Sequence, residues 1–205
     1  MNRSKLLEAE GRFLSQYPDG FDDPGLAHIK KKHNVDKLSE FAQEALARTQ
    51  FHRPAHVVDT ALKIVSRSSM VSRFEKPKFR DFVRCLNSAE QEAFANALEM
   101  RLYGRAKKRG FEEIVGMLQP HGIAKWSVVS VIPFHVAPRR EVFVKPTTAK
   151  GVIARLEIES LEYRPLPSWA FYQGYQRLLR DIRDTVSPRL SPNNAALTGF
   201  LMTSL

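Results

Sequence analysis

The stretch Leu118-Gln-Pro-His-Gly-Ile-Ala-Lys-Trp-Ser127 joins two apolar segments in the middle of the chain. The segment before it, 111–118, predicts a short helix that ends where Pro120 and Gly122 interrupt the pattern. A turn of this kind that leads into a helix N-terminus presents backbone amides, and such amides hold anions.

The segment after the turn, 126–132, is open to two interpretations. Its β-branched residues favour a strand. A buried helix is equally compatible, because periodicity does not decide for a short apolar run. Prolines divide the stretch that follows at positions 133, 138 and 146. The sequence therefore allows at most a small sheet around 126–146.

Apolar residues recur at helical spacing along most of the remaining chain. Ser88, followed by Gln91 three residues later, is the expected N-cap of one helix. We expect a mainly α fold in one compact multi-helix domain, 1–205, with sub-lobes of about 1–110 and 111–205 as an alternative organisation. The predicted helices are 4–17, 35–48, 54–67, one that starts at Pro77, 88–103, 111–118, one that Thr147 or Thr148 caps and that runs to about residue 160, 168–185, and 191–202.

The composition is that of a globular protein with a buried core, since 43% of the residues are hydrophobic and 26% are charged. The N-terminal residues 1–10 have no apolar core of signal-peptide length. The longest apolar stretch, 128–134, is too short to span a bilayer. Cys85 is the only cysteine, so no disulfide forms within the chain, which favours a reducing compartment. We therefore expect a cytoplasmic protein with no membrane partner.

The formal net charge of +10 comes from one part of the chain. Residues 61–155 carry eighteen Lys and Arg against eight Asp and Glu. Residues 1–60 are balanced at nine against nine, and residues 156–205 at five against five. A basic excess this localised indicates a polyanionic partner. The alternative is a solvated basic surface that only aids solubility.

Cations, serines and phenylalanines are interleaved in the stretch 66–80. Arginine and lysine neutralise phosphates, and serine hydroxyls hold phosphates in position. The alternative is a solvated loop that Phe74 and Phe79 anchor to the core. The candidate phosphate-binding residues of this stretch are Arg67, Ser68, Ser69, Arg73, Lys76, Lys78 and Arg80.

A second candidate anion site surrounds the helix start expected near residue 147. Two lysines and two threonines lie around this N-terminus, where the field of the helix favours anions. They are Lys145, Thr147, Thr148 and Lys150. Thr147 and Lys150 also have the spacing of a nucleophile and its lysine partner. Helix capping by a threonine is the structural alternative.

Three segments resemble, in the same order, the helix-hairpin-helix DNA glycosylases, and in particular the 3-methyladenine DNA glycosylase branch. Residues 118–127 resemble the hairpin L-P-G-I-G-R-W-T-A, with Ala124 in place of the second glycine. Residues 141–148 resemble D-V-F-L-P-D-D, and residues 164–170 resemble W-x-P-W-R-S-Y-A. The resemblance covers about residues 118–175 and implies a helix-hairpin-helix fold whose hairpin binds a DNA phosphate. Gly122 matches a hairpin glycine and Lys125 stands for the basic residue, so the resemblance makes both candidate phosphate-binding residues.

The chain departs from that family at the catalytic position. The family's aspartate falls at Thr147 or Thr148, and no acid occurs between Glu141 and Glu157. Trp126 stands where the endonuclease-III-like members place a lysine nucleophile. Without the carboxylate, the group that stabilises the developing cation and activates water is missing. The resemblance therefore implies DNA binding without glycosylase or lyase chemistry.

The sequence gives no reason to expect a metal or a cofactor. His52 and His56 have the spacing of two metal ligands on one helical face. Pro54 lies between them, however, and neither a cysteine partner nor H-E-x-x-H is present. No P-loop and no G-x-G-x-x-G occurs, and no carboxylate stands out as a general acid or base.

We therefore expect a nucleic-acid-binding protein whose partner is DNA rather than RNA. One alternative is an enzyme that acts on a phosphorylated or nucleic-acid substrate. Another is a basic interaction protein for an acidic protein partner. The sequence leaves the catalytic residues and the oligomeric state undefined. The side chains available to the enzyme alternative are Thr147, Lys150, Ser68 and Ser69.

Overall fold

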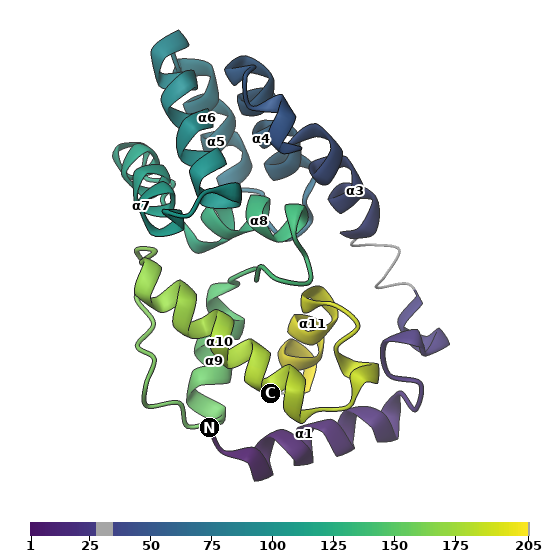
Figure 1. The fold of residues 1–205 in the computed structure, drawn as a ribbon. Coiled ribbons are helices and arrows are strands. Elements are labelled where there is room, and N and C mark those ends of the chain that lie inside the picture. Colours follow the sequence, from purple (N-terminus) through teal and green to yellow (C-terminus); the bar gives the residue numbers. More distant parts are fainter. Residues whose placement is uncertain (28–34, 205) are drawn as a thin grey trace.

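The computed structural model describes residues 1–27 and 35–204, and this part of the chain is helical and contains no strand (Figure 1). The prediction of a mainly α fold is confirmed. Short 3-10 turns are η1 (Gly20–Asp22), η2 (Pro24–Leu26), η3 (Arg48–Gln50), η4 (Gln119–His121) and η5 (Pro188–Leu190). The helices are α1 (Arg3–Gln16), α3 (Val35–Ala45), α4 (Pro54–Arg67), α5 (Glu75–Cys85), α6 (Ser88–Tyr103), α7 (Lys107–Leu118), α8 (Trp126–Val136), α9 (Pro146–Arg155), α10 (Trp169–Thr185) and α11 (Asn194–Ser204).

The helices form two groups that meet along one boundary (Figure 1). Lobe A contains α3 to α8, and in it α6 packs against α7 and α4, while α8 packs against α3 and α4. Lobe B contains α1, α9, α10 and α11, and in it α11 packs against the other three helices. Residues 137–145, called here the connecting segment, link α8 of lobe A to α9 of lobe B.

The two lobes do not follow the order of the chain. The N-terminal helix α1 lies with the C-terminal helices, so both ends of the chain belong to lobe B (Figure 1). The amide of Asn2 donates to the carbonyl of Leu156 at 2.8 Å, which joins the start of α1 to the end of α9. This grouping differs from a division near residue 110, because α7 and α8 lie beyond that residue and still pack within lobe A.

The segment 126–132 forms the first part of α8 and is not a strand. Every residue from Trp126 to His135 is buried, because other helices of lobe A surround α8. A helix that is buried all round has no polar face, so its sequence lacks the periodicity of an amphipathic helix. Pro133 lies within this helix, and the region 126–146 contains no sheet.

Two helix starts differ from the predicted positions by one or two residues. The N-cap of α6 is Asn87 and not Ser88, and its side chain accepts a hydrogen bond from the amide of Glu90. The Glu90 carboxylate accepts in return from the amide of Asn87, which completes a capping box. Helix α5 begins at Glu75, so Pro77 lies inside its first turn, where proline is tolerated.

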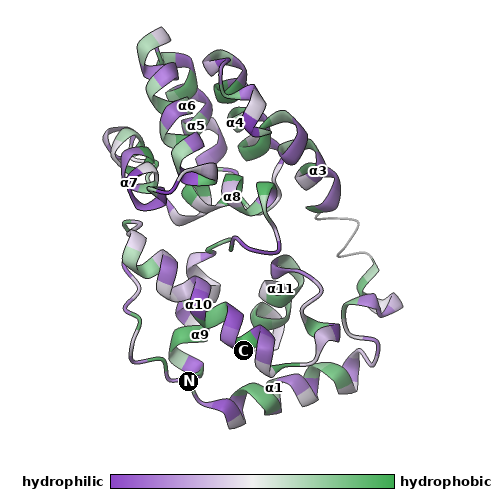
Figure 2. Ribbon diagram, in the orientation of Figure 1, coloured by the Kyte–Doolittle hydropathy of each residue, from purple (hydrophilic) through white to green (hydrophobic). Residues whose placement is uncertain are grey.

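The hydropathy of the helices follows their burial. Hydrophobic and hydrophilic residues alternate along α1 and α10 (Figure 2), as expected for helices that bury one face. On α1 the buried face consists of Leu6, Ala9 and Phe13. No helix in the ranges 1–27 and 35–204 is both long enough and apolar enough to cross a membrane.

Aromatic rings fill the boundary between the lobes. Phe111 of α7 contacts Trp169 and Tyr172 of α10 at centroid distances of 5.5 and 5.8 Å. Trp126 of α8 contacts Phe171 of α10 at 4.9 Å. Aromatic side chains bury large apolar areas, and the buried residues of both lobes form one continuous core. The boundary is therefore a packed interface.

Candidate functional site

Two cavities lie at the boundary between the lobes, and the connecting segment contributes to both. The large cavity, of about 1000 Å³, includes Phe143 and Lys145 of this segment, residues 69–73 and the starts of α3, α5 and α9. The small cavity, of about 350 Å³, includes residues 139–142 of the segment and one face of α10. Neighbouring residues of one extended segment therefore line different cavities.

The large cavity brings together five of the predicted phosphate-binding residues. Three come from the basic stretch 66–80 and two from the start of α9, which is distant in the sequence. The two anion sites that the sequence predicts separately therefore contribute to the wall of one cavity in the folded chain. The five residues are Ser69, Arg73, Lys76, Lys145 and Thr147.

The other exposed candidates lie outside both cavities. The guanidinium of Arg67 lies over the ring of Phe41 at 5.1 Å, and the ammonium of Lys150 lies over the ring of Tyr163 at the same distance. Both cations therefore already form a cation–π contact with an aromatic ring. The remaining candidates of this kind are Lys78, Arg80, Gly122 and Lys125, and all four are exposed.

Two of the predicted hydroxyl residues are buried. The exposed fraction is 1% for Ser68 and 6% for Thr148. Ser68 Oγ accepts a hydrogen bond from the amide of Met70 at 3.3 Å and also lies 3.4 Å from His135 Nε2, so it is engaged within the fold. Thr148 Oγ1 has no hydrogen-bond partner within the described residues. Each of these residues adjoins an exposed neighbour of the same type, and sequence alone does not show which member of such a pair faces inward.

The loop that carries the basic stretch is held to lobe A by hydrogen bonds. The amide of Ser72 donates to Glu75 Oε2 at 3.1 Å, and Ser127 Oγ donates to the same oxygen at 2.6 Å. Ser127 belongs to α8, so the carboxylate of Glu75 joins the loop to the central helix. Glu75 and Ser127 both line the large cavity, and nothing in their sequence spacing indicates this contact.

Phe74 projects from this loop toward solvent. Its ring is 69% exposed, and the guanidinium of Arg73 lies 4.8 Å from the ring centroid. Phe79 is only 1% exposed. The expectation that both phenylalanines anchor the stretch therefore holds for Phe79 alone, because Phe74 precedes α5 and has no core position to fill.

A buried histidine supports the base of the same loop. His135 Nδ1 lies 3.1 Å from Ser39 Oγ, and His135 Nε2 lies 3.4 Å from Ser68 Oγ. Burial lowers the pKa of His135 to about 4, because the charged imidazolium would lose its hydration. The ring is therefore neutral at physiological pH and joins α3, α8 and the loop through polar contacts.

The turn between α7 and α8 closes tightly around Gly122. This residue has φ of 65° in the left-handed region, which glycine adopts without strain. The amide of Gly122 donates to Gln119 O at 3.0 Å, and the amide of Ile123 donates to Leu118 O at 3.2 Å. Lys125 is the N-cap of α8, and no side chain caps this helix start. The turn therefore presents an exposed glycine and lysine next to an uncapped N-terminus.

Helix α9 begins two residues earlier than a Thr147 cap, and three earlier than a Thr148 cap, would place it. Its N-cap is Lys145, and Pro146 occupies the first helical position. Thr147 and Thr148 therefore lie inside the first turn, and the prediction that one of them is the cap is wrong. Proline is favoured at this first position because it lacks an amide hydrogen, and the helix needs none there. Lys145 and Thr147 nevertheless line the large cavity at the start of the helix.

Three carboxylates also line the large cavity. They are Asp22 of η1, Asp36 of α3 and Glu75 of α5. Sequence reasoning singled out none of them, because each has the appearance of an ordinary turn or first-turn residue. Only the packing of η1 and α3 beside the basic loop brings these acids into one cavity. The wall thus combines cations, carboxylates and the hydroxyl of Thr147.

A buried ion pair lies beside the small cavity. Arg101 Nη2 donates to Glu141 Oε2 at 2.7 Å, and Arg101 Nη1 donates to Glu141 Oε1 at 3.2 Å. The hydroxyl of Tyr172 donates to Glu141 Oε2 at 2.8 Å. Burial favours the protonated carboxyl, but the bonds from Arg101 and Tyr172 outweigh it and lower the pKa of Glu141. Glu141 is therefore ionised and paired.

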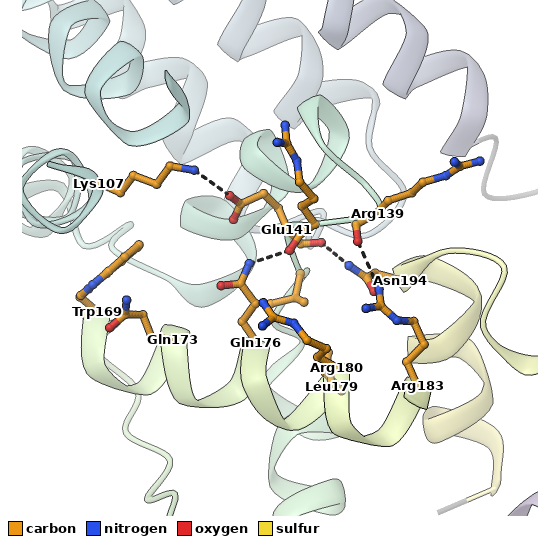
Figure 3. Close-up of a pocket in the computed structure, with 12 residues that line it drawn as sticks. Lys107, Arg139, Glu141, Trp169, Gln173, Gln176, Leu179, Arg180, Arg183 and Asn194 are labelled. Atoms are coloured by element: carbon orange, nitrogen blue, oxygen red, sulfur yellow. Dashed lines mark hydrogen bonds and ion pairs between the residues drawn. The ribbon is translucent and has the colours of Figure 1, made fainter. Parts of the chain in front are cut away.

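Lobe B also holds the backbone of the connecting segment at this cavity (Figure 3). The hydroxyl of Tyr172 accepts a hydrogen bond from the amide of Val142 at 3.2 Å. The segment is thereby bonded to lobe B at four consecutive residues. Three side chains donate to successive carbonyls: Arg183 Nη1 to Arg139 O at 3.3 Å, Gln176 Nε2 to Arg140 O at 2.6 Å, and Asn194 Nδ2 to Glu141 O at 2.8 Å.

The two histidines with metal-ligand spacing bond to backbone carbonyls. His52 Nδ1 lies 2.7 Å from Thr49 O, and His56 Nε2 lies 3.1 Å from Ala45 O. Within residues 1–27 and 35–204, no three His, Cys, Asp or Glu side chains are grouped so that they could hold a metal ion.

The comparisons with known proteins identify no relative of this chain. No protein family, no characterised protein and no solved structure matches the chain. The function is therefore argued from the site itself.

Proposed function

We propose that the protein binds nucleic acid, DNA rather than RNA, through the basic loop and the start of α9, and that it does so without glycosylase catalysis. The observation that carries this proposal is the meeting of Arg73, Lys76 and Lys145 at one cavity. These cations come from two separate stretches of a chain with a net charge of +10. Cations gathered on one surface are the main source of affinity for a phosphate backbone.

Phe74 adds a second kind of contact to this surface. In the chain it lies between Arg73 and Glu75, which both line the large cavity, and the Arg73 guanidinium covers one side of its exposed ring. The other face of a ring next to cations suits the stacking of an unpaired base, and such stacking contributes about 1–3 kcal/mol per base. Phe74 is not part of the buried core, so its position supports a ligand-binding role.

The turn at Gly122 supports the same proposal. Its exposed glycine, and Lys125 at the uncapped start of α8, offer backbone amides and a cation to a phosphate. The preference for DNA rests on the resemblance of this turn to the helix-hairpin-helix glycosylases. The resemblance also places that family's catalytic aspartate at Thr147 or Thr148. A hydroxyl there does not stabilise a developing cation as a carboxylate does, so we propose binding without base excision.

The direct test is fluorescence anisotropy of the purified protein with labelled duplex DNA, single-stranded DNA and RNA over a salt series. We expect binding to DNA that weakens with salt, with a slope of about −0.9 per phosphate contacted on a duplex. RNA should bind more weakly than DNA of the same length. Failure to bind any of the three at low salt would remove the proposal and favour an acidic protein partner.

The site is tested with the triple variant Arg73→Gln, Lys76→Gln, Lys145→Gln. Losing three phosphate contacts should make the salt slope shallower by about 0.9 for each contact and weaken binding by about 100-fold at low salt. Folding of the variant is checked by circular dichroism.

The matched control removes the same charge from lobe B. Arg3, Arg155 and Arg177 are exposed and line neither cavity. The triple variant Arg3→Gln, Arg155→Gln, Arg177→Gln should keep most of the affinity and the original slope. Equal losses in the two variants would show that binding follows net charge alone, and the proposed site would be wrong.

The large cavity also favours a second candidate, an enzyme acting on a nucleic-acid or phosphorylated substrate. Its volume of about 1000 Å³ is that of a small-molecule site, and Glu75 Oε1 makes no hydrogen bond within the described residues. Glu75→Gln and Thr147→Ala should then abolish turnover of oligonucleotides or phosphate esters while the fold is kept. Thr148 is buried and is not a candidate nucleophile here.

A further inference from the structure

The residues that line the small cavity carry more positive than negative charge, even after the ion pair of Arg101 with Glu141 is set aside. Among the described residues that line it, Glu141 is the only acid, and Arg101 already forms two hydrogen bonds with that carboxylate. The charges of Arg101 and Glu141 therefore cancel within the wall. Arg139 also lines the cavity, but Figure 3 shows its side chain extending away from α10. The cations that remain around the cavity are Lys107, Arg140, Arg180 and Arg183.

Half of these cations have no acidic partner within the described residues. Arg183 lies 3.6 Å from Asp184, and Lys107 lies at the longer distance of 3.8 Å from the already paired Glu141. Arg139, Arg140 and Arg180 form no ion pair in this part of the chain. Like charges around one hollow repel each other, and an anion in the hollow removes this repulsion.

The wall of the cavity is already fixed in place. Gln176 and Asn194 hold the backbone of the connecting segment, and Figure 3 shows the side chains of Arg180 and Arg183 extending from α10 toward that segment. A ligand therefore meets a preorganised wall and loses little affinity to the ordering of loops. Arginine is well suited to this purpose, because its planar group forms two parallel bonds with a phosphate.

The cavity has the dimensions of a site for a small ligand. Its volume of about 350 Å³ lies at the lower end of the range of small-molecule pockets, about 300–1,000 Å³. The half-buried ring of Trp169 and the amide of Gln173 add an apolar face and a polar group to the wall. The nucleic-acid surface proposed above uses other residues at the large cavity, so the two sites are separate.

We propose that the small cavity binds a small molecule that carries two or more linked phosphate groups, with Arg140 and Arg180 as its main contacts. Linked phosphates supply several negative charges within a compact volume, which matches several cations around a small hollow. This proposal does not depend on nucleic-acid binding at the large cavity.

The test is isothermal titration calorimetry with tripolyphosphate as the probe, and with inorganic phosphate and sulfate for comparison. We expect saturable one-to-one binding of tripolyphosphate, at least about tenfold tighter than binding of inorganic phosphate. The double variant Arg140→Gln, Arg180→Gln should weaken tripolyphosphate binding by about 100-fold, since each lost charged contact is worth about tenfold. The control variant Arg155→Gln, Arg177→Gln removes the same charge outside both cavities and should bind normally.

Tryptophan fluorescence locates the bound anion. Trp169 lines the small cavity, whereas Trp126 is buried at 1% exposure. Tripolyphosphate should therefore change the emission of the protein, and Trp169→Phe should abolish the change while calorimetry still detects binding. An emission change that survives Trp169→Phe would place the anion elsewhere and overturn the proposal.

Three further outcomes would also overturn the proposal. Absence of saturable binding would remove the site, and equal weakening in both double variants would show that the effect follows net charge alone. The phosphate groups of a nucleic acid are the other source of this chemistry, and a duplex oligonucleotide distinguishes it. If the duplex displaces tripolyphosphate and loses affinity with Arg140→Gln, Arg180→Gln but not with the control, the cavity is part of a nucleic-acid surface. If duplex affinity is equal in the two variants, the small-molecule proposal stands.

Discussion

The two cavities differ in how their walls are built, although the connecting segment contributes to both. At the small cavity, lobe B side chains bond to the backbone of four consecutive residues, 139–142. At the large cavity, the segment contributes Phe143 and Lys145, and the facing wall is a loop with an exposed phenylalanine. One cavity is therefore lined by side chains that hold the lobes together, and the other by side chains that remain available to a large partner.

Substitutions at the two cavities should therefore affect different properties, stability in one case and ligand binding in the other. Glu141 at the small cavity is buried and paired, so changing it affects folding. Arg73 and Thr147 at the large cavity are exposed, and so is the adjoining Phe74, so changing these residues affects ligands and not the fold. The following predictions test this separation in order of decreasing effect.

The largest expected effect is the loss of stability in Glu141→Gln. Neutralising this residue leaves the buried guanidinium of Arg101 without its counter-charge, and breaking a buried pair in this way costs about 3–5 kcal/mol. Denaturant unfolding measures the change. Glu113→Gln, which breaks the exposed pair with Arg109, should cost less than about 1 kcal/mol. Similar losses in both variants would contradict the special role of the small cavity.

The next effect is a pH dependence that His135 imposes on stability. Its folded-state pKa of about 4 lies below the ordinary value of 6.5, so the unfolded chain takes up the proton first as the pH falls. Stability should therefore be complete above pH 6.5 and fall by about 3 kcal/mol between pH 6.5 and 4.

The measurement is a series of unfolding curves between pH 7 and 4.5. The lower limit matters, because Glu141 also has a lowered pKa and its contribution is lost below about pH 4.5. His135→Gln should flatten the decline in this window. His52→Gln, at an exposed position, should keep the slope of the original protein. A decline that is the same in all three proteins would mean that His135 is not its source.

A smaller effect is expected for Phe74→Ala, and it concerns binding rather than folding. Loss of one stacking ring should reduce affinity for single-stranded DNA by about 1–3 kcal/mol, with unfolding midpoints unchanged. Anisotropy titration at constant salt measures the loss. Leu7→Ala removes another exposed apolar side chain, 51% exposed on α1, and should leave affinity unchanged. If Phe74→Ala binds as tightly as the control, Phe74 does not stack on a base.

The smallest effect distinguishes the two adjacent threonines of α9. Thr148→Val replaces a buried hydroxyl that lacks a partner among the described residues, and should stabilise the fold by about 1 kcal/mol. Thr147→Val changes an exposed position, so stability should stay within about 0.5 kcal/mol, while affinity for DNA falls slightly. A destabilised Thr148→Val protein would show that this hydroxyl is satisfied in solution.

The sequence was sufficient for the helical fold class and for most helices. Where a helix has one polar face, as α10 does, the apolar spacing predicts it well. The same reasoning left α8 undecided, because a helix buried on all sides has no polar face to mark its period. The predicted starts of α6 and α9 differ from the observed ones. Asn87 takes the N-cap of α6 and Pro146 the first helical position of α9, although hydroxyl residues nearby also suit a helix start.

For the candidate sites, local sequence specified residue type and charge, including the basic stretch 66–80 and the lysines around α9. The packing of the helices selected which of these residues meet at the large cavity, and it buried Ser68 and Thr148 while leaving Ser69 and Thr147 at the cavity wall. It also created the pairing of Arg101 with Glu141 and the cationic small cavity. The physical reason is that side-chain direction and long-range contact depend on how helices pack against each other, and local sequence patterns do not encode that packing.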